Sequence, residues 1–287
     1  MALAEPSYLA RVTTQPAPAI PAASKLAIRP VRTLAEYAAC VALQDATWGA
    51  GFSERVPTAI LKVAQRIGGV TAGAFAADGT LLGFVFGMTG VDNGRIVHWS
   101  DMLAVRTDAR NLGIGQRLKA YQRDHCRRLG VEVIYWTYDP LVARNAYLNL
   151  GRLGARAVEY VCDMYGAETD SPLHRGIGSD RFVVAWEIAR PSPTPGSDDI
   201  ATLIPAAMEA PVVGTPESND APLARGVPLL RVEVPADIGA VQARSLDDAA
   251  RWRASTRGAF TTALANGYAV AGFYRDAGGR CYYVLQC

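Results

Sequence analysis

The spacing of apolar residues predicts alternating strands and helices through the first two thirds of the chain. Runs that are apolar at every second position, or continuously, are typical of strands, whereas apolar residues every three or four positions are typical of helices. The predicted strands cover residues 26–30, 70–77, 81–88, 96–105, 131–138, 158–164 and 182–188. The predicted helices cover residues 34–48, 57–67, 114–129 and 142–153. Their order, β-α-α-β-β-β-α-β-α-β-β, predicts an α/β domain with a mixed, mostly antiparallel central sheet flanked by helices.

Turn and capping residues mark several of these boundaries. Asp78-Gly79 separates two strand-like runs and is a strong hairpin signal. Thr33 is a suitable N-cap for the first helix, and Pro57 suits the first turn of the second helix. Gly130 follows the third helix, where glycine commonly ends a helix.

Proline density divides the chain into four regions. Residues 1–24, rich in Ala and Pro, are expected to form a flexible arm before the domain of residues 25–189. Residues 190–226 contain seven prolines, which disfavour a continuous helix or a central strand and predict a linker. Residues 227–287 show a β-α-β-β pattern that is too short for a core of its own. We expect this segment to dock on the domain, extending its sheet or covering its face, or else to form a homodimer contact.

Composition and charge narrow the class of protein. The net charge of +2 gives no reason to expect a nucleic-acid partner. No apolar run of about 18 residues or more occurs, which excludes a membrane span. The five cysteines are scattered without a CxxC pair, so neither a disulfide framework nor a metal site is predicted. These features favour a reducing, cytoplasmic compartment.

A glycine-containing loop between a predicted strand and a predicted helix is the main candidate for binding chemistry. Gly113 and Gly115 allow backbone N–H groups to point into a common concavity, and the helix that starts there directs its positive end to the same place. Arg110 adds positive charge, as Arg117 would. This arrangement suits a diphosphate. The loop lacks the Gly-Lys-Ser/Thr of a Walker loop and the third glycine of a dinucleotide-binding fingerprint.

Residues 105–115, Val-Arg-Thr-Asp-Ala-Arg-Asn-Leu-Gly-Ile-Gly, resemble the pattern V-x-P-x-x-R-x-x-G-x-G of the GNAT superfamily of N-acetyltransferases. The order of elements agrees with that superfamily over residues 26–188, and residues 145–155 are similar to its later helix. Trp-Thr-Tyr-Asp-Pro at residues 136–140 and Ser-Asp-Arg-Phe at residues 179–182 resemble one branch of it. The chain differs from the general pattern in its C-terminal extension.

The resemblance implies transfer of an acetyl or succinyl group from CoA to the amine of a small metabolite, with an amino acid as the expected acceptor. The strands at residues 96–105 and 131–138 would separate and hold the pantetheine arm between them. The residues expected to contact acyl-CoA are Leu103, Val105, Arg110, Leu112, Gly113, Ile114, Gly115 and Asn145. No metal ion is expected in this chemistry.

A general base is needed because an amine attacks a thioester only after losing a proton. Asp101 is the first candidate, since a regular strand places it on the same face as Leu103 and Val105. His98 is the second candidate. A regular strand would point it to the opposite face, and a bulge would reverse that expectation.

A general acid for the leaving thiolate is harder to assign. Members of the superfamily often carry a tyrosine four residues before the glycine that ends the later helix, and Leu150 occupies that position here. Tyr147, one turn earlier, and Tyr138, at the end of the neighbouring strand, are the alternatives. A thiol with a pKa near about 8.5 also leaves without an obligatory acid.

The acceptor pocket is expected to involve the loop before the last strand of the domain. Arg175 and Arg181 could bind a carboxylate in a bidentate manner, and Trp136 could line the same pocket. The basic residues Arg251, Arg253 and Arg257 of the C-terminal segment are expected on a solvated helix face. Two other functions stay open: a non-catalytic module that binds acyl-CoA, and a different thioester reaction such as O-acylation.

Overall fold

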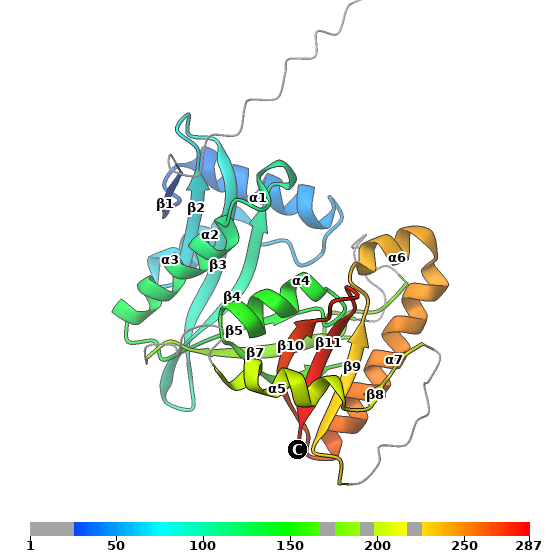
Figure 1. Cartoon of the computed structure of the whole chain (residues 1–287). Helices are drawn as coiled ribbons and strands as arrows, with labels where there is room; N and C mark the ends of the chain where they lie inside the picture. The colour runs from blue at the N-terminus through cyan, green and yellow to red at the C-terminus, as the bar shows by residue number, and fades with distance from the viewer. Residues whose placement is uncertain (1–25, 167–175, 190–197, 217–225) are drawn as a thin grey trace, which may run out of the picture.

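The computed structural model describes residues 26–166, 176–189, 198–216 and 226–287 (Figure 1). A seven-stranded sheet has the strand order β1-β2-β3-β4-β5-β7-β6. Its strands are β1 (Ala27–Pro30), β2 (Val70–Phe75), β3 (Leu81–Asp92), β4 (Arg95–Val105), β5 (Val133–Tyr138), β6 (Arg156–Val161) and β7 (Arg181–Glu187). Its helices are α1 (Leu34–Trp48), α2 (Thr58–Arg66), α3 (Ile114–Arg128) and α4 (Ala143–Ala146), which continues into the π-helix η3 (Tyr147–Arg152). The element order and the mixed sheet predicted from the sequence are confirmed.

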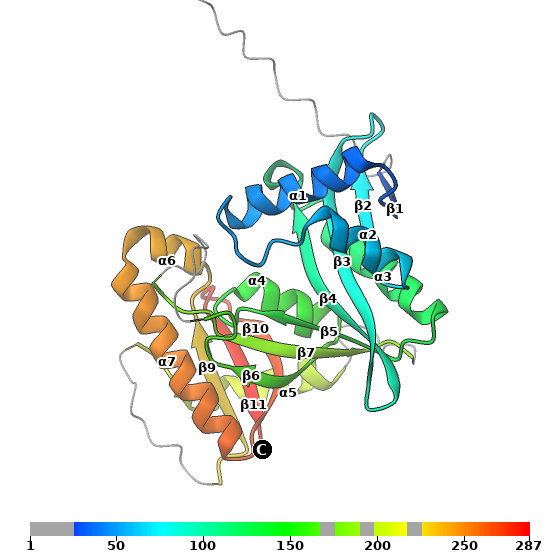
Figure 2. The ribbon, with the colours of Figure 1, turned by 180° about the vertical axis from the view of Figure 1, so that it is seen from behind.

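The pairing within this sheet is antiparallel except between β4 and β5, which run parallel. Apolar side chains cover both of its faces. Tyr37 of α1 and Leu61 of α2 belong to one buried cluster, and Ile114 and Leu118 of α3 belong to another. Accordingly, α3 crosses the face of the sheet seen in Figure 1, whereas α1 and α2 cover the face seen in Figure 2. The sheet therefore separates an α3 face from an α1–α2 face.

A β-bulge interrupts β4 at Asp101. Phe86 of β3 pairs with Met102 and Gly87 pairs with Ser100, which leaves Asp101 without an opposite residue. Bulges bend a strand and re-aim its side chains. The strand is therefore not regular, and the alternative of a bulge applies: the extra residue brings both His98 and Leu103 to the α3 face.

The C-terminal segment forms a second sheet with the strand order β10-β11-β9-β8. The segment contributes β9 (Leu229–Val234), α6 (Ile238–Arg244), α7 (Leu246–Ala265), β10 (Ala269–Arg275) and β11 (Cys281–Gln286). Two further elements, α5 (Asp198–Met208) and the edge strand β8 (Val212–Val213), come from the predicted linker. The segment thus does not extend the first sheet. The sequence pattern did not predict α6. The expectation that prolines prevent a helix between residues 190 and 226 is also wrong, because residues 198–208 form α5 with Pro205 inside it, and one proline removes only its own i→i−4 hydrogen bond.

Packing joins the C-terminal segment firmly to the first sheet. The Phe260 ring of α7 lies edge-on to Phe182 of β7, with centroids 4.8 Å apart, and edge-on to Tyr283 of β11 at 5.2 Å. The Tyr283 hydroxyl donates to the Pro140 carbonyl at 2.9 Å. Buried residues of both parts belong to one continuous core, so we expect them to unfold together.

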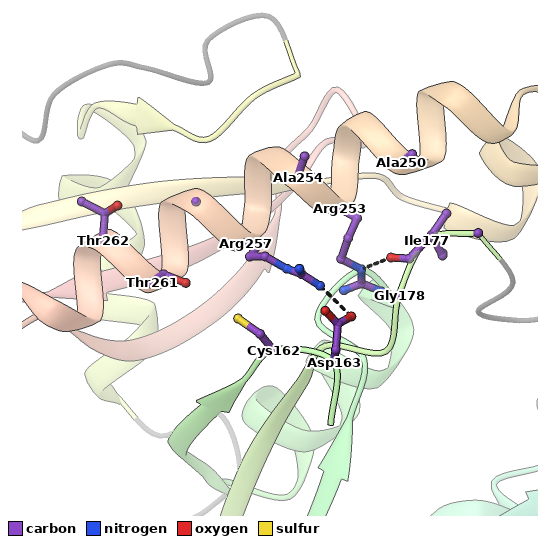
Figure 3. A pocket seen from close by; sticks show the side chains of 12 residues that line it. Cys162, Asp163, Ile177, Gly178, Ala250, Arg253, Ala254, Arg257, Thr261 and Thr262 are labelled. Atoms are coloured by element: carbon purple, nitrogen blue, oxygen red, sulfur yellow. Dashed lines mark hydrogen bonds and ion pairs between the residues drawn. The ribbon is translucent and has the colours of Figure 1, made fainter. Parts of the chain in front are cut away.

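Two arginines of α7 reach from the C-terminal segment to the first sheet (Figure 3). Arg253 is buried, with Nη2 2.7 Å from the Asp139 carboxylate and Nε 3.0 Å from the Ile177 carbonyl. Arg257 pairs with both Asp163 and Asp180 beside a cavity of about 740 Å³. The expectation of a solvated helix face holds for Arg251, whose side chain is 64% exposed. It is wrong for Arg253 and Arg257, because α7 packs these two positions onto the acidic loops that follow β5 and β6.

None of the helices in the described residues is both long and apolar enough to cross a bilayer. Within the same residues, no group of three or more His, Cys, Asp or Glu side chains is arranged to hold a metal ion.

Candidate active site

The loop before α3 presents an uncapped helix N-terminus. Gly113 is the N-cap, with φ 70°, and no side chain caps the helix or places an acid in its first turn. Asn111 is also left-handed, with φ 66°, so alternating backbone conformations flank Leu112. N–H groups in such a turn converge, and the helix dipole adds positive potential. The loop therefore has the backbone geometry and the positive potential that suit an anion such as a diphosphate.

The two arginines of this loop differ in availability. Arg110 is exposed, and its guanidinium can therefore reach a ligand at the loop. Arg117 donates to the Leu26 carbonyl at 2.9 Å, which ties its side chain to the start of β1. Arg110 is thus the better placed of the two.

The hydrogen-bond ladder between β4 and β5 ends before it reaches this loop, and we call the stretch of strand edges that it leaves unpaired the slot. The parallel pairing of β4 with β5 consists of three residue pairs and ends at Trp99 and Tyr135. Beyond that point β4 continues to Val105, while β5 remains paired only with β7 on its other side. Figure 1 shows β4 turning away from β5. Two strand edges without a shared ladder can hydrogen-bond an extended ligand inserted between them.

Asp101 lies at the bulge where the slot begins. The side chain is exposed to solvent, but the protein that surrounds its carboxyl raises the pKa by desolvation. The Glu54 carboxylate, from the loop between α1 and α2, raises the pKa of Asp101 further. A carboxylate with a raised pKa is a stronger base than an ordinary aspartate.

His98 is a structural histidine. It is buried, its Nδ1 lies 3.0 Å from the Thr89 hydroxyl, and its Nε2 lies 3.0 Å from the Gln122 amide nitrogen. Because the Thr89 hydroxyl donates to the Gly68 carbonyl and the Gln122 nitrogen is a donor, the ring is neutral and carries its proton on Nδ1. Burial and the Lys119 ammonium lower the pKa of His98 to about 3. We therefore no longer consider it as the base.

Comparison with known proteins identifies the family of the domain that contains this loop. Residues 39–151 match the family model of the acetyltransferase (GNAT) family. This part of the chain is therefore a GNAT acetyltransferase domain. GNAT enzymes are acyltransferases that take the acyl group from CoA, so the uncapped loop and the slot lie in an acyltransferase domain. No curated protein matches the chain in sequence.

Several solved structures are similar to the GNAT part of the chain. The NatC complex bound to Gag peptide and CoA shares 18% identity, with 57% of this chain and 98% of that chain covered and a TM-score of 0.47. The ribosomal-protein-S18-alanine N-acetyltransferase from Escherichia coli shares 14% identity, with 58% and 96% covered and a TM-score of 0.45. An aminoglycoside 6'-N-acetyltransferase complexed with CoA shares 15% identity, with 58% and 99% covered and a TM-score of 0.43.

The tyrosines considered as acids lie in contrasting places. Tyr138 is buried in the core, and burial raises its pKa above the ordinary value, so it is not available as an acid in the slot. Tyr147 is exposed on η3, with the Arg152 guanidinium 5.4 Å from its ring centroid. Leu150 is half-buried on the same π-helix. Only Tyr147 is accessible, and its role stays a prediction.

Two of the residues considered for the acceptor pocket, Arg181 and Trp136, are buried. Arg181 is the first residue of β7 and is buried, 2.8 Å from the Asp180 carbonyl and 3.8 Å from the Asp139 carboxylate. It is therefore not the exposed clamp that the sequence suggested. Trp136 is buried on the α3 face and donates from its indole N–H to Asn149 at 3.2 Å. Arg175 lies outside the described residues.

Asn145 lies in the later helix, and Leu103 and Val105 lie on β4, which are the elements that the sequence predicted for them. Asn145 is half-buried in α4, and its N–H donates to the Val142 carbonyl at 2.8 Å. Leu103 and Val105 are half-buried on the part of β4 that borders the slot. Their contacts with acyl-CoA remain predictions.

Two features of the site were missed by sequence reasoning. Glu54 lies close enough to Asp101 to affect its pKa, and no motif marks it. Lys119 is buried on α3 and donates to the Ser100 hydroxyl at 2.8 Å. A lysine among the polar residues of an amphipathic helix normally indicates a solvated face, which is why its burial could not be predicted.

Proposed function

We propose that this GNAT enzyme transfers an acetyl group, or a related acyl group such as succinyl, from CoA to the amine of a small metabolite. The observation that carries the proposal is the uncapped N-terminus of α3 beside the slot between β4 and β5. The loop of residues 110–115 would bind the diphosphate, with the N–H groups of Leu112, Gly113, Ile114 and Gly115 as donors. The slot would then hold the pantetheine arm and place the thioester near Asp101.

Asp101 is proposed as the general base. It would take a proton from the ammonium of the acceptor, directly or through one water, and the neutral amine would attack the thioester carbonyl carbon. The carbon–sulfur bond then breaks, and its electron pair leaves with the CoA sulfur. The raised pKa of Asp101 supports this role because it brings the carboxylate closer in basicity to the proton it must accept.

The charge around the base favours a cationic acceptor. Asp101 and Glu54 place two carboxyl groups on the same side of the site, and these attract a protonated amine before it is deprotonated. Thr137 and Tyr165, whose hydroxyls lie 3.0 Å apart, offer further hydrogen-bonding groups near the end of β5. Because Arg181 is buried beside Asp139, a carboxylate clamp is not part of the proposal. Amino acids remain the first small amines to test.

One observation favours the non-catalytic alternative, a module that only binds acyl-CoA: Leu150 occupies the place of the usual tyrosine acid. A panel assay separates the two. The full chain is mixed with acetyl-CoA or succinyl-CoA and with amino acids, polyamines and amino sugars, and free thiol release is measured. We expect thiol release that depends on the amine and gives an equal amount of amide by mass spectrometry. Binding of acyl-CoA without release for any amine would support the module, and acylation of a hydroxyl would support O-acylation.

A further inference from the structure

Lys119 is a buried cation whose described partners are neutral. Its Nζ lies 2.8 Å from the Ser100 hydroxyl, 3.3 Å from the Gln122 carbonyl oxygen and 3.9 Å from the centroid of the Trp136 ring. These contacts occupy three directions, as the three N–H bonds of an ammonium require. In the part of the chain that the structure describes, Lys119 forms no salt bridge with a carboxylate. A buried charge without a counter-ion is costly, so an anion that comes close to Lys119 would be strongly stabilised there.

The position of Lys119 points to the anion. Ser100 is the first residue of β4 beyond the last pair with β5, and Trp136 is the first residue of β5 beyond it. Lys119 bridges these two residues from α3, and it therefore lies under the point where the slot opens. An anion forms at this place in each turnover of the proposed reaction, because the CoA sulfur leaves as a thiolate.

The rest of the network fixes which groups can move a proton. Gln122 joins Lys119 to His98, whose proton is on the Nδ1 that faces Thr89, so His98 does not supply a proton toward the slot. The Ser100 hydroxyl accepts from Lys119, and among the described residues it has no acceptor for its own hydrogen. That hydrogen is available to a ligand. Burial also lowers the pKa of Lys119 to about 7, so that its ammonium releases a proton near neutral pH.

We propose that Lys119, acting through Ser100, supplies the proton taken up by the CoA sulfur. This inference rests on the proposed acyl transfer. As the carbon–sulfur bond breaks, the Ser100 hydroxyl proton moves to the sulfur, and a proton of the Lys119 ammonium moves to the Ser100 oxygen. CoA leaves as the thiol, Lys119 is left as a neutral amine, and solvent reprotonates it when the slot empties. Ser100 is then the catalytic residue, and Lys119 is the positioning residue behind it. The relay fills the role of the acid that Leu150 cannot perform.

The thiol of bound CoA gives a test that needs no acceptor. The full chain is saturated with CoA, and thiolate absorbance is followed against pH after subtraction of the free protein. The thiolate and the Lys119 ammonium stabilise each other and titrate as a pair. In the wild type we therefore expect the bound thiol to ionise at a pH at least one unit below that of free CoA, a tenfold stabilisation of the thiolate. Lys119→Met should abolish this difference, whereas Lys119→Arg, which keeps the charge, should preserve it. An equal thiol pKa in the wild type and in Lys119→Met would overturn the proposal.

Measurements of kcat separate the effect of the Lys119 charge from the delivery of a proton by Lys119. Each of three variants should lower kcat by about 10–100-fold and leave KM for acyl-CoA nearly unchanged: Lys119→Met, Lys119→Arg and Ser100→Ala. The methionine and alanine variants each lack one group of the relay, and the guanidinium of the arginine variant does not release a proton. The wild-type kcat should fall as pH rises through the Lys119 pKa, and this limb should be absent in Lys119→Arg. The other titratable groups near Lys119 should not produce this basic limb. The pKa of His98 is about 3, and burial raises the pKa of Cys126 to about 12. Asp101 affects kcat on the acid side of the pH profile.

Failure of this inference differs from failure of the proposed function. If the wild type turns over and Lys119→Met has the same kcat and pH profile, the relay is wrong and acyl transfer stands. If the wild type binds CoA but transfers no acyl group, the proposed function is wrong, and the thiol titration still decides whether Lys119 stabilises the thiolate. If CoA does not bind, both are overturned. Lys119→Met should fold at least as stably as the wild type, since it removes a desolvated ammonium.

Discussion

Asp101→Asn is expected to lower kcat by about 10²–10⁴-fold at neutral pH, the usual range for loss of a general base. The amide has nearly the shape of the carboxyl but accepts no proton, so KM for acyl-CoA should change little. Steady-state assays with the best acceptor from the amine panel measure both constants. A variant that keeps more than about half of the wild-type kcat would exclude Asp101 as the base.

The pH dependence and stability of the same variant provide its controls. Because the folded protein raises the pKa of Asp101, the wild-type kcat should fall on the acid side at a higher pH than an ordinary aspartate would give. The raised pKa also means that ionisation of this group at neutral pH opposes folding. Asp101→Asn should therefore be at least as stable as the wild type. Asp124→Asn, an exposed ion-paired aspartate of α3, should leave kcat unchanged.

Arg253→Met is expected to destabilise the fold by about 3–5 kcal/mol, the usual cost of removing one partner of a buried ion pair. Arg253 is 4% exposed, and its loss removes the closest cation from Asp139, which is 5% exposed. Arg181, with a nitrogen 3.8 Å from that carboxylate, would compensate only in part. Urea unfolding followed by tryptophan fluorescence measures the free energy of unfolding.

Arg251→Met is the matched control for this change. Arg251 lies on the same helix, but its side chain is 64% exposed and pairs with Asp248 at the surface. Exposed pairs contribute about 0–1 kcal/mol, so the control should unfold nearly as the wild type does. Equal unfolding free energies for Arg253→Met and Arg251→Met would show that the contact with Asp139 does not hold the two sheets together.

Much of the fold was predictable because it depends on local patterns. Amphipathic periodicity, the Asp78-Gly79 turn and the Thr33 cap each specify backbone geometry within a few residues. The structure even contains the capping box of Thr33 with Glu36. The short helix α6 could not be predicted with the same ease, because residues 238–244 are fewer than two full apolar repeats.

The same distinction between local and long-range determinants applies to the candidate site. The uncapped loop around Gly113 follows from nearby residues, so the sequence located it. The bulge at Asp101 depends on pairing with β3, and the burial of Tyr138 and Arg181 depends on packing of a segment that is distant in the sequence. Lys119 shows the limit most clearly, since its burial is set by Ser100 and Trp136 on two different strands.

The central claim, that the loop before α3 binds the diphosphate of CoA, is tested most directly by titration calorimetry of CoA with Gly113→Asp and Gly113→Asn. Both side chains tolerate the left-handed backbone, and nothing lies within 4 Å of a Cβ at Gly113, so both variants should fold. They differ in charge alone. We expect Gly113→Asn to bind CoA within a few-fold of the wild type, and Gly113→Asp to bind at least about 100-fold more weakly, because its carboxylate faces the diphosphate. Equal affinity of the two variants for CoA would contradict the placement of the diphosphate at this loop.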